Sequence, residues 1–90
     1  MTPDLNLKRA ASAEQAVAKF ADAVNADDTR QAIQDLLCDI GHLCDLEGLD
    51  FQKIIVTAVG WWHAERIDPE VILDGPSVTL SIDGTEVASW

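Results

Sequence analysis

The spacing of apolar residues predicts three helices in the first two thirds of the chain. In the first of them, over residues 10–24, an apolar side chain recurs every third or fourth position, as one face of an amphipathic helix requires. These positions are Ala10, Ala13, Val17, Phe20, Ala21 and Val24. Two starts fit this helix, because Pro3 suits a first turn and Ser12 with Gln15 forms a capping box. Because its apolar face consists largely of alanine, we expect this helix to bury little surface.

The second and third helices have clearer ends. Asp28 and Gln31 form a capping box, and the apolar positions that follow it are Ile33, Leu36, Leu37, Ile40, Leu43 and Cys44. Gly48 is expected to end this second helix in the left-handed conformation, and Asp50 to cap the third. The row predicted to face the core from the third helix is Phe51, Ile54, Ile55, Ala58, Val59 and Trp62.

The last twenty residues change to the period-two alternation of a β-hairpin. Val78, Leu80 and Ile82 alternate with polar residues, and Asp83-Gly84 is typical of a type I′ turn between two strands. The register that this turn predicts pairs Ile82 with Thr85, Leu80 with Val87 and Val78 with Ser89. Residues 71–73 are the candidate for a third strand. We therefore predict one α+β domain over residues 1–90, in which a three-helix bundle (1–66) precedes an antiparallel β-hairpin (71–90).

Charge is distributed unevenly along the chain. The chain has sixteen acidic and six basic side chains. Residues 31–90 contain eleven of the acids but only two of the bases, Lys53 and Arg66. A surface of this sign repels nucleic acid and membrane phosphates and attracts basic partners. Three helices followed by a hairpin could also form a winged helix, but a DNA-reading helix needs several basic residues for phosphate contacts. We therefore expect no direct binding to nucleic acid or membrane.

The candidate partner-binding residues are the acids of this part of the chain and one tryptophan. Carboxylates one helical turn apart are separated by about 6 Å, a spacing comparable with that of backbone phosphates. Solubility is the simpler explanation of the acidity, but a soluble domain usually intersperses both signs of charge. Trp61 lies about 100° round its helix from the predicted core row, so it could anchor a partner, or the hairpin and Trp90 could cover it. The predicted set is Asp35, Asp39, Asp45, Trp61, Glu65, Asp68, Glu70 and Asp74.

The second helix also presents residues that could bind a metal ion. Asp35, Asp39 and His42 lie within about 60° of one another round this helix. We nevertheless predict a solvated face without metal or cofactor, because no second helix supplies a matching pair of ligands. Cys38 and Cys44 are too far apart on one helix for a disulfide, so free thiols and the cytoplasm are expected. The sequence assigns no role to these thiols, to His42 or to His63.

One protein family and one broader class of proteins share features with the segment from Asp35 to Phe51, which reads DLLCDIGHLCDLEGLDF. It resembles the helical core of MazG-type nucleotide pyrophosphohydrolases, although the first glutamate pair of that family is missing and Glu14 stands alone. Extended to Arg66, the segment looks more like small acidic proteins encoded by phages and mobile elements. That resemblance implies proteins that bind and block host machinery, anti-CRISPR proteins among them.

These observations favour a non-enzymatic inhibitor, encoded by a phage, that blocks a basic surface of a host protein as a DNA mimic would. That surface could be one that binds nucleic acid. A metal-dependent nucleotide pyrophosphohydrolase of MazG type is the first alternative. A homodimeric structural module that associates through the third helix is the second.

Overall fold

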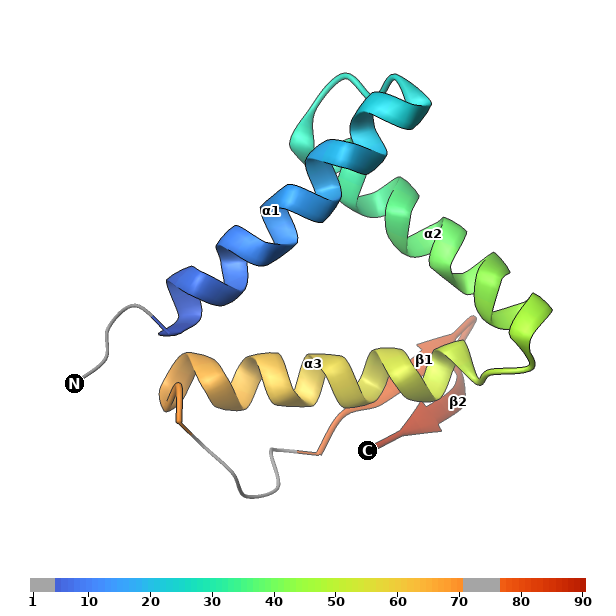
Figure 1. Cartoon of the computed structure of the whole chain (residues 1–90). Helices are drawn as coiled ribbons and strands as arrows, with labels where there is room; N and C mark the ends of the chain where they lie inside the picture. The colour runs from blue at the N-terminus through green and yellow to red at the C-terminus, as the bar shows by residue number, and fades with distance from the viewer. Residues whose placement is uncertain (1–4, 71–76) are drawn as a thin grey trace. The chain divides into compact units, whose positions relative to one another are not determined.

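The computed structural model describes residues 5–70 and 77–90, and it confirms the predicted α+β class (Figure 1). Three helices precede a two-stranded antiparallel sheet: α1 (Leu5–Val24), α2 (Thr29–Glu47), α3 (Phe51–Ile67), β1 (Thr79–Ile82) and β2 (Thr85–Ser89). The candidate third strand at residues 71–73 lies outside the described residues. Internal contacts divide the chain into an N-terminal unit, Met1–Glu47, and a C-terminal unit, Gly48–Trp90. Helix α3 therefore belongs to the same unit as the hairpin, whereas the sequence pattern groups it with the other two helices in residues 1–66.

The helix ends follow the predicted caps, with one of the two proposed starts of α1 excluded. Asp28 Oδ1 accepts a hydrogen bond from the Gln31 N–H at 2.8 Å, and Asp50 Oδ1 accepts one from the Lys53 N–H at 3.1 Å. Gly48 follows α2 with φ +71°, as a left-handed helix end requires. Ser12 is not a cap, because α1 already begins at Leu5 and the Ser12 hydroxyl donates to the Lys8 carbonyl one turn back.

Replacing either capping aspartate by alanine should lower the free energy of unfolding by about 1 kcal/mol, because one backbone N–H of the first turn loses its acceptor. Urea unfolding followed by far-ultraviolet circular dichroism measures this loss. The matched control is asparagine, which keeps the acceptor oxygen without the charge. A loss as large for Asp50→Asn as for Asp50→Ala would show that charge and not capping stabilises α3.

The N-terminal unit is a helical hairpin with little buried surface. Helices α1 and α2 meet near the loop that joins them and diverge away from it (Figure 1). Ala32 of α2 is fully buried at this meeting point, and no residue of α1 is buried. Small side chains such as Ala13, Ala18 and Ala21 line a groove of about 510 Å³ between the helices. The expectation that the alanine-rich helix buries little is confirmed.

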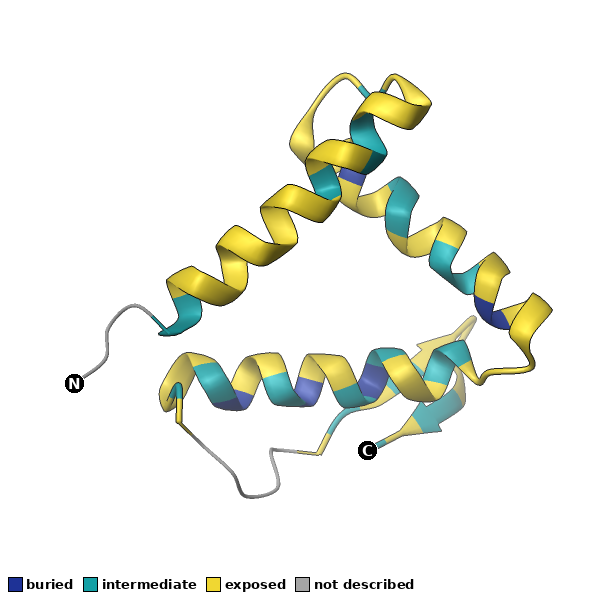
Figure 2. Cartoon of the chain, viewed as in Figure 1, coloured by how far each residue is buried: buried dark blue, intermediate teal, exposed yellow. Residues whose placement is uncertain are grey.

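The C-terminal unit has its core between α3 and the hairpin. The buried residues of α3 are Val56, Gly60 and Ala64, which form a single row on the helix (Figure 2). The predicted core row was wrong, since Ile54 is 42%, Val59 41% and Trp62 56% exposed. The hairpin packs instead on the row with the smallest side chains. A glycine in that row allows a bulky group of the hairpin to approach the helix backbone closely.

The hairpin has the predicted turn but a different register away from it. Asp83 and Gly84 have φ of 52° and 78°, as a type I′ turn requires, and Ile82 pairs with Thr85 as expected. The register then shifts between Leu80 and Ser81, so Leu80 pairs with Ala88 and not with Val87.

This irregularity is a β-bulge, and it decides which face Trp90 occupies. Beyond it, Val78 and Trp90 exchange two backbone hydrogen bonds of 2.9 and 2.8 Å. Directly opposed residues of an antiparallel pair lie on the same face, so Val78, Leu80, Ala88 and Trp90 share one face. The predicted register would have put Trp90 on the other face. The extra residue therefore turns Trp90 toward α3, where its ring lies against Gly60.

Candidate partner-binding surface

Three of the predicted acids lie on α2 in the N-terminal unit. Asp39 and Asp45 are exposed and Asp35 is half-buried. Asp35 and Asp39 are one turn apart, and Asp45 lies about 80° round the helix from Asp35, on the side of Cys38 and His42. We call Asp35, Asp39 and Asp45 the α2 acidic row.

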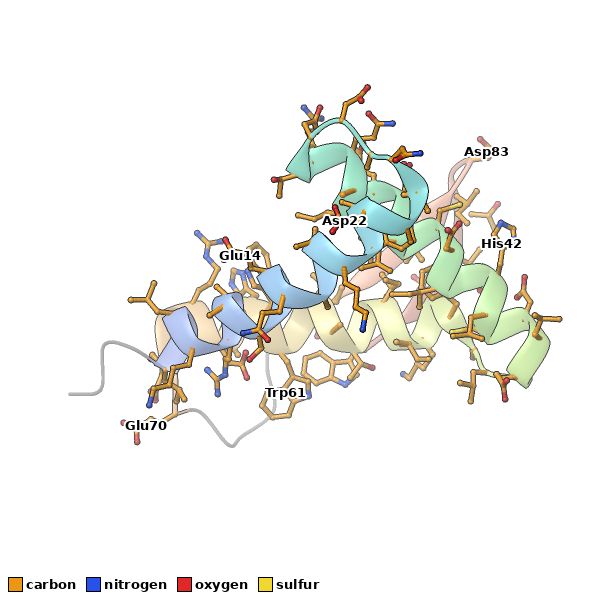
Figure 3. The ribbon with its side chains drawn as sticks, turned by 45° about the horizontal axis from the view of Figure 1, so that its top comes forward. Glu14, Asp22, His42, Trp61, Glu70 and Asp83 are labelled. Atoms are coloured by element: carbon orange, nitrogen blue, oxygen red, sulfur yellow. The ribbon has the colours of Figure 1, made fainter. Side chains whose placement is uncertain are left out.

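The remaining predicted acids belong to the C-terminal unit. Glu65 is half-buried near the end of α3, and Asp68 is exposed just beyond it. Glu70, two residues further on, is also exposed (Figure 3). Asp68 also has a structural role, because its N–H donates to the Ala64 carbonyl and its Oδ1 accepts from the Glu70 N–H at 3.1 Å. Asp74 lies outside the described residues. The structure thus brings Asp68 and Glu70 together, and it assigns the α2 acidic row to a separate unit.

Of the two neighbouring tryptophans of α3, Trp61 has one of its two predicted environments, and Trp62 does not have the predicted one. Trp61 is half-buried, and its ring centroid lies 5.8 Å from that of Trp90, so the hairpin covers part of it. Trp62, which was predicted to belong to the core, is the more exposed of the two. Sequence reasoning missed Trp62 as a surface residue, although α3 is apolar on several faces and a two-stranded hairpin can cover only one of them.

The two basic residues of the C-terminal unit contact groups other than carboxylates. Lys53 Nζ donates a 2.7 Å hydrogen bond to the Ser89 carbonyl and so ties α3 to β2. The Arg66 guanidinium lies 4.8 Å from the centre of the Trp62 ring, within the range of a cation–π interaction. Lys53 therefore stabilises the packing of the C-terminal unit, and Arg66 covers part of the exposed Trp62 ring.

Helix α2 also carries a thiol and an imidazole in contact. Cys38 Sγ lies 3.9 Å from His42 Nε2, and both residues are exposed, whereas Cys44 is buried. Within residues 5–70 and 77–90, no three His, Cys, Asp or Glu side chains are grouped so that they could hold a metal ion. The set Asp35, Asp39 and His42 is thus not brought together as a three-ligand site.

Comparison with known proteins gives no relative from which a role could be transferred. None of the helices in the described part of the chain has the length and apolar character needed to cross a membrane. No protein-family model, curated protein or solved structure matches the chain.

Proposed function

We propose that this protein is a non-enzymatic binding protein whose acidic surface docks on a basic surface of a host protein and blocks it. In this proposal it acts in the cytoplasm of a bacterial host, and a phage or mobile element encodes it, as for inhibitors of the anti-CRISPR class. Inhibition is steric and electrostatic: the bound acidic protein occupies a surface that would otherwise contact nucleic acid.

The observation that carries this proposal is the placement of the only two bases after residue 30. Lys53 contacts a backbone carbonyl and Arg66 an aromatic ring, so neither offsets a carboxylate of the described residues through an ion pair. A soluble domain usually intersperses charges of both signs, which weakens its field. Because these two cations are used elsewhere, exposed carboxylates such as Asp39 and Asp45 retain their field and can attract a basic partner over about one Debye length.

The end of α2 supports the same conclusion. Its last turn contains Asp45 and Glu47 and no basic residue. Negative side chains near a helix C-terminus oppose the helix dipole at a cost of about 0.3–1 kcal/mol each. Local helix stability would favour lysine or arginine at these positions, so it does not account for the two carboxylates, and the proposal assigns them to the acidic surface.

Trp62 supplies the apolar contact that a charged surface alone lacks. More than half of its surface is exposed, and the Arg66 guanidinium lies over its ring. Tryptophan is enriched among the few residues that dominate interface energies, whereas exposed charges contribute mainly to association rate and specificity. Trp62 therefore joins Trp61 as a candidate anchor on α3.

A pair of charge-reversed variants tests the proposal on the full chain. Asp39→Lys with Asp45→Lys should lower affinity for a captured host protein by about 100-fold, because two attractions become repulsions. The partner is first isolated from host lysate, and the dissociation constant is then measured with purified components by calorimetry. Affinity should also fall as salt is raised, since exposed charges are screened.

The matched control is Glu14→Lys with Asp22→Lys on α1, where both residues are exposed (Figure 3). Each reversal adds two charges, so both double variants carry a net charge of −6 in place of −10. Equal losses in the two variants would mean that only total charge matters. Affinity that does not depend on salt would eliminate the electrostatic mechanism.

A further inference from the structure

Cys38 and His42 are separated by a distance that one metal ion could span. The two residues are one turn apart on α2, and Sγ and Nε2 lie 3.9 Å from each other. Zinc binds thiolate sulfur at about 2.3 Å and imidazole nitrogen at about 2.0–2.1 Å. If an ion lay at both distances, the angle between its bonds to Sγ and Nε2 would be about 125°, within about 20° of the tetrahedral value. Little movement of either side chain is needed.

The surroundings of the pair favour a cation. Asp35, Cys38, His42 and Asp45 follow a spacing of three, four and three residues, so they form one stripe along α2. A carboxylate thus lies one turn before the thiol and another one turn after the imidazole. Such carboxylates can hold metal-bound water and fix the orientation of the ligands, and their negative charge raises the local concentration of cations.

We propose that Cys38 and His42 form a two-ligand chelate for a divalent ion of the zinc class, with water in the remaining positions. Thiolate and imidazole select zinc, cobalt or copper over magnesium and calcium, which prefer oxygen ligands. The absence of a third protein ligand among the described residues makes the site open and exchangeable. Binding releases the thiol proton to solvent and involves no redox step. The site does not depend on the proposed partner.

Cobalt titration of the reduced, metal-free full chain tests this inference, because a cobalt–thiolate bond gives a charge-transfer absorption band that carboxylate coordination does not give. We expect one ion per chain, binding in the micromolar range, and displacement of cobalt by zinc. Cys38→Ser should abolish the band, and His42→Asn should weaken binding by about tenfold or more. Asp35→Asn with Asp45→Asn should weaken it by a smaller factor and leave the band in place.

The chain offers a matched control for each ligand. Cys44 is the other thiol, buried on the same helix, and His63 is the other imidazole, exposed on α3. Cys44→Ala and His63→Asn should bind cobalt as the unaltered chain does. Loss of the band in Cys44→Ala, retention in Cys38→Ser, or absence of the band at millimolar cobalt would overturn the proposal. A ratio of one ion to two chains, with a doubled solution mass, would also overturn a chelate made within one chain.

Discussion

Gly60→Ala is expected to destabilise the C-terminal unit, although alanine is the better helix former. In an exposed helix this change would stabilise the fold by about 1 kcal/mol. Here a Cβ atom at position 60 would overlap the six-membered ring of Trp90. The ring must leave its place on α3, so its apolar burial and its contact with Trp61 are lost. We expect a net loss of about 1–2 kcal/mol in the free energy of unfolding, measured by urea denaturation.

A double-mutant cycle with Trp90 distinguishes overlap with the Trp90 ring from a destabilisation of α3 that any substitution at Gly60 would cause. Trp90→Ala alone should cost about 2–3 kcal/mol, less than a fully buried tryptophan, because Trp90 is half-buried. In the Trp90→Ala background the overlap is gone, so Gly60→Ala should become stabilising by about 1 kcal/mol. Additive effects of the two substitutions on the free energy of unfolding would contradict the packing of the Trp90 ring against Gly60.

Ala32→Asp is expected to separate α1 from α2. Ala32 is fully buried where the two helices meet, and an unpaired carboxylate there would lose its hydration. The expected cost is about 3 kcal/mol or more, and opening of this contact is the simplest way to avoid it. Hydrogen exchange measured by mass spectrometry should show faster exchange of the α1 amides, because α1 has no buried residue of its own to hold it.

Gln34→Asp is the matched control for this substitution. It adds the same charge to the same helix at an exposed position two residues away. Its effect should stay within about 0.5 kcal/mol, apart from the lower helix propensity of aspartate. Similar losses in Ala32→Asp and Gln34→Asp would mean that total charge, and not burial at the helix crossing, limits the stability of the N-terminal unit.

The features that local chemistry governs could be predicted from the sequence. Asp28 and Asp50 cap their helices, Gly48 ends α2, and Asp83-Gly84 makes the turn, because each depends on the conformations and hydrogen bonds of a few adjacent residues. The acids of the candidate site could also be found from charge alone, and their role in binding stays a prediction.

The face that each element buries could not be predicted. Two rows of α3 are apolar, and the periodicity favoured the row of larger residues that ends at Trp62. The structure buries Val56, Gly60 and Ala64 instead, and it leaves Trp62 exposed beneath Arg66. A single sequence also gives no sign of the bulge that puts Trp90 on the face toward Gly60, because the bulge follows from pairing and packing with another element.

The amino-acid sequence by itself determined the three helices, the hairpin, the caps of α2 and α3 and the acidic character of the chain after residue 30, since these depend on residue type and short-range spacing. The Arg66–Trp62 contact joins residues one turn apart on α3, but only the tertiary structure decided that Lys53 donates to the Ser89 carbonyl and that Trp90 packs on Gly60. Such contacts depend on a geometry that no local pattern contains, and most of them join residues distant in sequence. For that reason Trp62 is the exposed tryptophan of α3, whereas the hairpin covers part of Trp61.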